Sequence, residues 1–230
     1  MEMKYRLEHL YKSYGNLILF DDFTIHFEPG EINCILGPSG CGKTSLLNII
    51  GGTIKPESGD TSDFHNAVIS YVFQDPRLLP WKTVKENISF VLKDKLPSGE
   101  TEKQAREYIH LMKLDNFADY YPSRLSGGMK QRVSLARAFS YRSDIILMDE
   151  PFKALDIKLK DNLMSLFTEL WARDRRTVIY VTHEIEEALR MGHKLFIFSN
   201  PPVNIEREFY ISKNSSKDKL REEIKSLMSS

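Results

Sequence analysis

The sequence predicts an α/β protein with a mainly parallel sheet, N-terminal antiparallel strands and an inserted α-helical subdomain. Two observations lead to this fold class: short, continuous apolar runs recur along the chain, and segments with helical spacing lie between them. The apolar runs, each typical of a strand covered on both faces, are residues 32–36, 145–148, 178–181 and 195–198. A helical zone at about 80–141 interrupts the alternation, and we expect it to form the subdomain.

The first strands show a different, alternating pattern, which is typical of strands with one buried face. The alternating residues are Tyr5, Leu7, His9 and Tyr11 in one segment and Phe23, Ile25 and Phe27 in the next, before a Pro29-Gly30 turn. A further apolar run at 68–73 predicts a strand that leads into the helical zone.

Several helix starts are marked by capping residues. Thr83 with Glu86, and Thr101 with Gln104, each match a capping box, in which two side chains satisfy free N–H groups at a helix start. Pro97-Ser98-Gly99 is expected to separate these two helices. Further helices are predicted at about 127–141, at 217–228, and over the leucines at 159, 163, 166 and 170.

The charge balance and the hydropathy argue against several classes of protein. Lys and Arg total 32, as do Asp and Glu, so the basic surplus with which nucleic-acid binders neutralise phosphates is missing. No apolar run approaches the roughly 20 residues that span a bilayer, and the N-terminus lacks the apolar stretch of a signal peptide. The two cysteines, Cys34 and Cys41, do not suggest a disulfide framework. We therefore expect a soluble intracellular protein that binds no nucleic acid.

The segment GPSGCGKT, from Gly37 to Thr44, has the spacing of a loop that binds nucleotide phosphates. Its glycines let backbone N–H groups converge on phosphate oxygens, and the helix that begins near Lys43 adds the positive end of its dipole. Lys43 supplies a charge for the β- and γ-phosphates, and the Thr44 hydroxyl suits Mg²⁺. Cys41 fits either a thiol of low pKa at a helix start or, the reading that we favour, a small residue that fills the loop. The loop predicts a nucleoside triphosphate as ligand.

Polar groups that suit hydrolysis follow three other predicted strands. Asp149 and Glu150 follow one apolar run and are expected to bind Mg²⁺ and to polarise the attacking water, respectively. His183 and Gln74 follow two others. Because ligands bind at the carboxyl ends of parallel strands, these side chains are predicted to emerge at the same edge as the phosphate loop.

The segment LSGGMKQR, from Leu125 to Arg132, adds a second helix start with the features of an anion site. Ser126 is the expected N-cap, and the two glycines after it expose backbone N–H groups. Because this segment lies in the helical zone, we expect it to contact the ATP of a second chain. The predicted assembly is a head-to-tail dimer that sandwiches two ATP molecules.

These segments together resemble the ATP-binding subunit of an ABC transporter, over nearly the whole chain up to about residue 210. PSGCGKT is similar to the Walker A motif of that family, ILMDE to its Walker B, LSGGMKQR to its signature, Gln74 to its Q-loop and His183 to its switch histidine. The resemblance implies a P-loop NTPase fold with a RecA-like core at about 1–79 and 142–210 and a helical subdomain at about 80–141. Residues 211–230 are then a short helical tail.

The resemblance also implies ATP and Mg²⁺ as cofactors and assigns the site residues by group. The catalytic residues are Glu150 as general base, His183, Gln74 and Lys43. The ATP contacts are Tyr14, stacked on adenine, and Gly37, Pro38, Ser39, Gly40, Cys41, Gly42, Lys43, Thr44 and Ser45. The Mg²⁺ ligands are Thr44, Gln74 and Asp149. The contacts to the ATP of the opposite subunit are Leu125, Ser126, Gly127, Gly128, Met129 and Gln131, and the D-loop is Ala154, Leu155 and Asp156.

One residue departs from the family pattern. Small residues such as Ser are frequent where Lys153 stands, just before the predicted D-loop. A lysine there either places a charge near the site of the partner or points into solvent, and the second reading is favoured.

The function implied by the resemblance is ATP hydrolysis that powers a membrane transporter, at the cytoplasmic face of the membrane. FQDPRLLPWKTVKENI and DEPFKALD look like the importer ATPases for nitrate, sulfonate, taurine and related solutes. The expected partners are a second copy, transmembrane permease subunits and, indirectly, an extracellular or periplasmic solute-binding protein. The loop from Gln74 to Trp81, with Leu78 and Leu79, is the expected docking surface for the permease.

Three other functions share part of the pattern. An exporter or lipoprotein-extraction ATPase has the same catalytic motifs. Only the resemblance to importer ATPases and the LLPW segment argue against this function. A soluble ABC-type ATPase of DNA maintenance usually has coiled coils or a basic surface, which this sequence lacks. A small-molecule kinase gives the segment from Leu125 to Arg132 no role.

Overall fold

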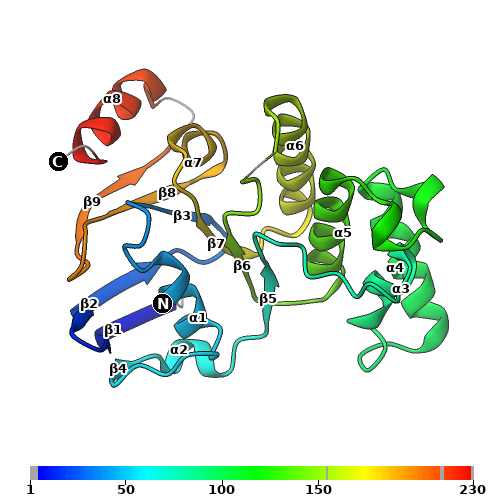
Figure 1. Cartoon of the computed structure of the whole chain (residues 1–230), viewed down its shortest axis with the longest axis horizontal. Coiled ribbons are helices and arrows are strands. Elements are labelled where there is room, and N and C mark those ends of the chain that lie inside the picture. The colour runs from blue at the N-terminus through cyan, green and yellow to red at the C-terminus, as the bar shows by residue number, and fades with distance from the viewer. Residues whose placement is uncertain (1–4, 154, 213–214, 229–230) are drawn as a thin grey trace. The chain divides into compact units, whose positions relative to one another are not determined.

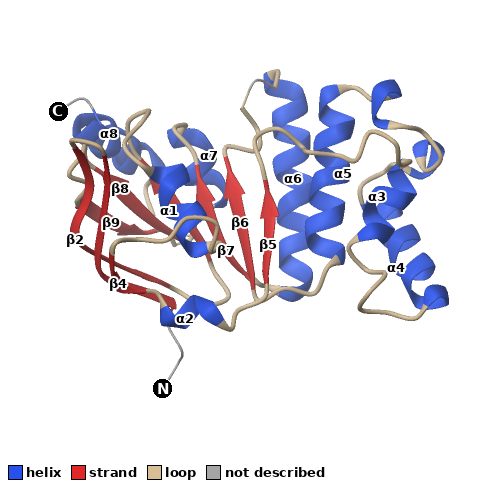
Figure 2. Cartoon of the chain, turned by 60° about the horizontal axis from the view of Figure 1, so that its bottom comes forward, coloured by secondary structure: helices blue, strands red, loops and turns tan. Residues whose placement is uncertain are grey.

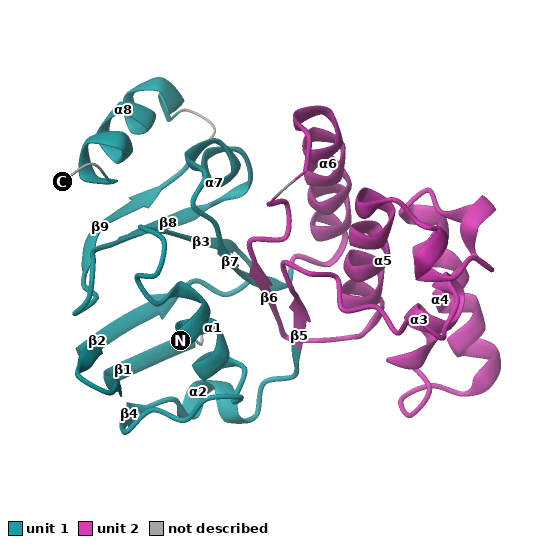
Figure 3. Ribbon diagram, in the orientation of Figure 1, with its two compact units in different colours: residues 1–69, 176–230 teal, residues 70–175 magenta. Residues whose placement is uncertain are grey.

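The computed structural model of the chain describes residues 5–153, 155–212 and 215–228 (Figure 1). The chain forms two compact units, residues 1–69 with 176–230 and residues 70–175 (Figure 3). The predicted strands at 32–36, 145–148, 178–181 and 195–198 are confirmed as β3, β6, β7 and β8. The predicted boundaries of the core and of the helical subdomain stay predictions.

The first unit combines an antiparallel sheet with a mainly parallel one. Its strands are β1 (Tyr5–Tyr14), β2 (Leu17–Phe27), β3 (Ile32–Leu36), β4 (Ser58–Asp60), β7 (Thr177–Val181), β8 (Lys194–Phe198) and β9 (Ile205–Tyr210). Its helices are α1 (Lys43–Ile50), α2 (Ser62–His65), α7 (Ile185–Met191) and α8 (Lys217–Met228). The antiparallel sheet has the order β2-β1-β4, and the other strands have the order β7-β3-β8-β9. β3 runs parallel to β7 and β8, whereas β9 is antiparallel to β8.

Aromatic side chains pack the two sheets of the first unit together. The Phe23 and Phe198 ring centroids lie 5.4 Å apart, and those of Phe27 and Phe196 lie 5.7 Å apart, both edge to face. All of these side chains are nearly or fully buried. This core fixes β8, the parallel neighbour of β3, and the phosphate loop follows β3.

The predicted alternation along β1 is wrong at its centre. Leu7 and Leu10, three residues apart, are both fully buried, while His9 is exposed and has a left-handed backbone with φ of 54°. The pairing register with β2 shifts between Leu7 and Leu10. A bulge of this kind adds a residue to one strand, so the two leucines face the same side.

The second unit is mostly helical. Its elements are β5 (Ile69–Val72), which begins at the unit boundary, β6 (Ile145–Asp149), α3 (Val84–Phe90), α4 (Ser98–Leu111), α5 (Gly127–Ser140) and α6 (Ile157–Asp174), with short 3₁₀ helices at Asp115–Phe117 and Pro122–Arg124. β5 and β6 lie side by side and point the same way (Figure 2). Phe139 of α5 packs edge to face on Phe167 of α6, with ring centroids 5.9 Å apart.

One of the two predicted capping boxes is confirmed and the other is wrong. At α3, the Glu86 N–H donates to the Thr83 hydroxyl and the Thr83 N–H donates to the Glu86 carboxylate. Thr101 instead lies inside α4, which begins at Ser98, and its hydroxyl donates to the Leu96 carbonyl. The Gln104 amide donates to the Ser140 carbonyl at the end of α5, so this tertiary contact takes the side chain away from any cap.

Candidate functional site

The phosphate loop connects β3 to α1 and needs glycine at the positions where the sequence has it. Gly40 and Gly42 have φ of 81° and 105°, a region that favours glycine. A Cβ atom on Gly42 would also lie 2.8 Å from Leu19 Cδ1. Gly37 is similarly confined, because its Cβ would lie 3.0 Å from the Phe198 Cβ. The loop is therefore shaped by backbone conformation and by packing on β2 and β8.

The Lys43 ammonium lies inside this loop. Its Nζ donates to the carbonyl oxygens of Gly37 at 2.8 Å and Pro38 at 2.7 Å, and the side chain is almost fully buried. A third contact of the ammonium is the Cys41 Sγ at 3.8 Å, and a thiol is a weak acceptor. A phosphate oxygen is a far better acceptor for that third N–H. The ammonium can therefore bind an anion while its hydrogen bonds to the two carbonyls remain.

The remaining residues of the loop differ in exposure. Ser39, Gly40 and Thr44 are exposed, Pro38 and Ser45 are half-buried, and Cys41 is buried. Burial raises the pKa of the Cys41 thiol, and the nearby Lys43 offsets this only in part. The thiol therefore stays protonated at neutral pH, which agrees with a filling role rather than a reactive one.

His183 follows β7, the parallel neighbour of β3. The Thr182 N–H donates to the Ile35 carbonyl at 3.2 Å, so the turn that carries His183 and the phosphate loop leave adjacent strands. The structure thus brings Lys43 and His183 to one edge of the sheet, as the sequence predicts.

A buried carboxylate that sequence reasoning missed orders this turn. Glu187 of α7 accepts hydrogen bonds from the Tyr180 hydroxyl and from the Thr182 hydroxyl, the latter at 2.7 Å. The Thr182 oxygen in turn accepts the Glu184 N–H at 3.1 Å. Burial, and then the charge of Glu187, raise the pKa of Tyr180, so the phenol remains a donor. The sequence signal that could have indicated this network is Tyr180 and Thr182, two residues apart around the end of β7, followed by a helix with acidic residues.

Tyr14 ends β1 in the same unit. Its side chain is 45% exposed, and the Lys12 Nζ lies 5.1 Å from the ring centroid. The exposed ring face suits stacking on a flat ligand, and the predicted contact with adenine stays a prediction.

In the second unit, Gln74 follows β5, while Asp149 ends the neighbouring strand β6 and Glu150 comes directly after it. Gln74 is exposed, while Asp149 and Glu150 are half-buried. Burial raises the pKa of Tyr71 on β5, and the negative charge of Asp149 adds to this effect. The Asp149 carboxylate and the Gln74 amide oxygen are the kind of ligand that Mg²⁺ prefers.

Glu150 has a strained backbone, with φ of 42°. Such a conformation is uncommon for a residue with a side chain and tends to occur at functional sites. Its carbonyl accepts the Lys153 N–H at 3.1 Å across a tight turn. The Lys153 Nζ lies 2.6 Å from the Glu150 Oε2, so the favoured expectation of a lysine that points only into solvent is wrong.

The predicted D-loop is described in part, because Ala154 lies outside the described residues. Leu155 is half-buried. The Asp156 carboxylate accepts the Leu159 N–H at 3.0 Å and caps α6. Asp156 thus has a local structural role as well as the predicted one.

The segment LSGGMKQ forms the start of α5. The Ser126 hydroxyl accepts the Met129 N–H at 3.3 Å, which confirms Ser126 as N-cap. Ser126 and Gly127 are exposed, whereas Leu125, Gly128 and Gln131 are buried and Met129 is half-buried. A Cβ atom on Gly128 would lie 2.5 Å from Leu159 Cδ2, while one on Gly127 would meet no heavy atom of the described residues within 4 Å. The second glycine therefore allows α5 to approach α6, and the first leaves the helix start open.

This difference yields a matched pair of variants. We expect Gly128→Ala to lower the free energy of unfolding by about 1–3 kcal/mol, because the added methyl overpacks the contact with Leu159. Gly127→Ala is expected to be neutral or stabilising by up to about 1 kcal/mol, since alanine favours a helix. Urea unfolding measures both, and adding Leu159→Ala to Gly128→Ala is expected to recover part of the loss. Equal effects of the two alanines would contradict the packing role.

The loop after Gln74 is held by side chains of the helices. The Arg137 guanidinium of α5 donates to the carbonyls of Pro76 at 2.9 Å and Arg77 at 3.0 Å, and burial lowers its pKa. The buried Asn87 of α3 accepts the Leu79 N–H at 2.8 Å and donates to the Leu79 carbonyl. Trp81 nevertheless stays 69% exposed. A large exposed ring on an anchored loop is typical of a contact surface.

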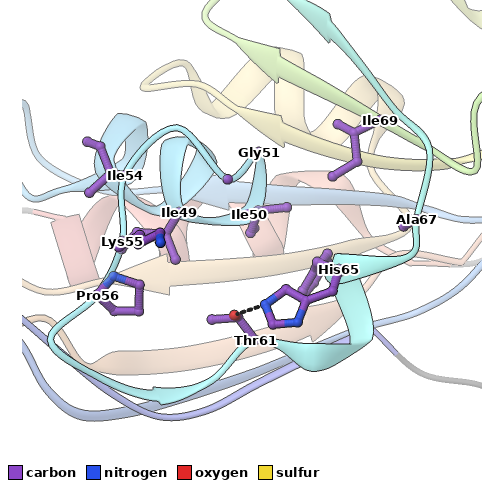
Figure 4. Close-up of a pocket in the computed structure, with 12 residues that line it drawn as sticks. Ile49, Ile50, Gly51, Ile54, Lys55, Pro56, Thr61, His65, Ala67 and Ile69 are labelled. Carbon is purple, nitrogen blue, oxygen red and sulfur yellow. Dashed lines mark hydrogen bonds between the residues drawn. The ribbon is translucent and has the colours of Figure 1, made fainter.

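A hollow of about 450 Å³ in the first unit lies apart from these residues (Figure 4). Its lining includes Ile49 and Ile50 at the end of α1, Phe64 and His65 of α2, and Ile69. The phosphate loop precedes the start of α1, so the hollow lies at the other end of that helix. It is separate from the predicted nucleotide site.

None of the helices in the described residues is long and apolar enough to cross a membrane.

Comparisons with known proteins give the family. Residues 20–153 match the ABC transporter family. The nitrate import ATP-binding protein NrtD of Synechocystis sp. is 36% identical over 208 residues, which cover 86% of this chain and 77% of that protein. The taurine import ATP-binding protein TauB of Pelagibacter ubique is 38% identical over 195 residues, which cover 82% and 74%.

Solved structures agree with this match. The dimeric structure of MJ0796, a bacterial ABC transporter cassette, has a TM-score of 0.78 and 33% identity, over 91% of this chain and 99% of that one. A dimeric post-hydrolysis state of MJ0796 bound to ADP and Pi has a TM-score of 0.76 and 32% identity, with the same coverage. The predicted fold class is confirmed, and the chain belongs to the ABC transporter family as one of its ATP-hydrolysing cassettes.

Proposed function

We propose that the chain powers the import of a small solute, working as a head-to-tail dimer that sandwiches two ATP molecules at the cytoplasmic face of the membrane. The observation that carries this proposal is the presence of two helix starts suited to phosphate, one after the phosphate loop and one at Ser126. A single binding loop suffices for many ATPases, so the second start calls for a shared nucleotide. The relatives named for nitrate and taurine import favour a small solute.

In this proposal the first unit holds the triphosphate. The N–H groups from Gly40 to Ser45 and the Lys43 ammonium bind the β- and γ-phosphates, and Tyr14 stacks on adenine. His183, held by the Glu187 network, contacts the γ-phosphate. The role of Lys43 is supported by its buried position and by its weak third contact.

The second unit supplies the hydrolytic groups. Mg²⁺, bound by Thr44, Gln74 and Asp149, would neutralise charge on the phosphates. Glu150 accepts a proton from water as the water oxygen attacks the γ-phosphorus and the bond to the β-phosphate oxygen breaks. Ser126 and Gly127, both exposed at the start of α5, are the groups best placed to meet the ATP of a second chain.

The loop from Gln74 to Trp81 is the proposed contact with transmembrane permease subunits, which in turn meet a solute-binding protein. Its support is the exposed Trp81 on a loop that Arg137 and Asn87 hold in place. A surface of this kind binds without much reordering, which lowers the entropic cost of association.

The test is affinity purification of the chain from detergent-solubilised native membranes, with mass spectrometry of the recovered proteins. Recovery of a polytopic membrane protein is expected, and recovery of the chain alone would contradict the transport function. Trp81→Ala is expected to reduce this recovery at least about tenfold, because exposed tryptophans often dominate interface energies. The ATPase activity of the isolated chain is expected to stay unchanged. Tyr210→Ala, which removes a similarly exposed ring on β9, is the control.

A further inference from the structure

We propose that Lys153 is a positioning residue that restrains the Glu150 carboxylate and so limits the rate of ATP hydrolysis. This inference rests on the proposed role of Glu150 as general base and concerns a residue outside the expected catalytic set. The observation behind it is an ion pair built into the turn that follows β6.

The turn is formed by Glu150, Pro151, Phe152 and Lys153. Proline at its second position has the backbone angle that such turns require, and the Lys153 N–H closes it by donating to the Glu150 carbonyl at 3.1 Å. Pro151 and Phe152 are buried, and Phe152 is fully so. The core therefore anchors the middle of the turn and fixes the two ends, which carry the opposite charges, next to each other.

The ion pair joins an accessible lysine to a shielded carboxylate. The Lys153 Nζ lies 2.6 Å from the Glu150 Oε2, and the exposed fractions of the two side chains are 43% and 13%. The Oε2 atom itself is buried. The paired Glu150 carboxylate, and then the charge of Asp149, raise the pKa of Lys153, so the ammonium is charged at neutral pH.

A general base works by offering a lone pair to the proton that it removes. The ammonium lies against one carboxylate oxygen of Glu150 and holds the carboxylate in place, so that oxygen is hindered from turning toward the attacking water. The ammonium is also exposed enough to leave the pair, whereas the carboxylate is held by its strained, anchored backbone. Lys153 therefore acts through Glu150 and is not itself a catalytic residue.

The experiment compares Lys153→Met, Lys153→Arg and Lys158→Met, with kcat and KM for ATP measured on the whole chain. Lys153→Met is expected to raise kcat about two- to fivefold, the range that corresponds to measured strengths of partly exposed ion pairs. KM for ATP is expected to stay unchanged, because neither residue of the Lys153–Glu150 ion pair belongs to the phosphate loop. Lys153→Arg keeps a cation and is expected to resemble the wild type. Lys158→Met removes an exposed charge on α6 and controls for net charge.

Two outcomes separate this inference from the proposed function. An unchanged or lowered kcat in Lys153→Met, with an intact unfolding transition, would overturn the restraint. The double variant Lys153→Met/Glu150→Gln is expected to be as inactive as Glu150→Gln, since the effect passes through the carboxylate. If Glu150→Gln itself remains active, the assigned base is wrong and the proposed mechanism fails with it.

Discussion

Replacing Glu150 with Gln is expected to lower kcat for ATP hydrolysis by about 10²–10⁴-fold, the usual contribution of a general base. Gln has almost the same shape, so it keeps the strained turn and the contact of its oxygen with Lys153, but it cannot take up a proton at neutral pH. Binding of ATP and closure of the dimer do not need that proton transfer. The variant is therefore expected to accumulate as an ATP-bound dimer.

Steady-state ATPase assays and light scattering with and without ATP measure the two effects. Glu169→Gln, an exposed substitution on α6, is the matched control and is expected to behave as the wild type. Hydrolysis above about a tenth of the wild-type rate would remove Glu150 from the role of base, since that loss falls short of a base contribution. A monomer in the presence of ATP would contradict the sandwich dimer instead.

Elements governed by local chemistry could be predicted well from the sequence. β3, β6, β7 and β8 coincide with short, mostly apolar runs, which are the pattern expected of strands buried on both faces. The phosphate loop combines glycine positions with a lysine in a spacing that only its function explains. Ser126 and Thr83 cap helices because their hydroxyls satisfy N–H groups three residues away.

Features that depend on tertiary contacts could not be predicted. Thr101 and Gln104 have the local pattern of a cap, yet Gln104 bonds to Ser140, 36 residues away. The bulge at His9 depends on how β1 pairs with β2 and with β4. No sequence pattern gives the register of that pairing at a single residue.

The site shows the same division. The positions of Glu150 and His183 are predictable because each follows an apolar strand, and that of Lys43 because it ends the glycine loop between β3 and α1; their roles stay predictions. The residues that hold these side chains in place could not be predicted. Glu187, for example, reaches the turn that carries His183 only because α7 packs against it. Lys153 is an intermediate case: its separation from Glu150 suits a turn, but the ion pair depends on the burial of Phe152 between them.

Lys43→Met is expected to weaken ATP binding by about 10- to 100-fold, because hydrogen bonds to charged groups contribute about 1.5–3 kcal/mol. Met has a similar length and can take the same buried position, so the variant is expected to keep the loop, although the carbonyls of Gly37 and Pro38 lose their donor. Fluorescent ATP-analogue titration measures the affinity, and Lys55→Met, an exposed lysine beyond α1, is the control. If Lys43→Met folds and binds ATP as tightly as the control, the buried ammonium serves only to close the loop, and the phosphate must be held by the backbone N–H groups alone.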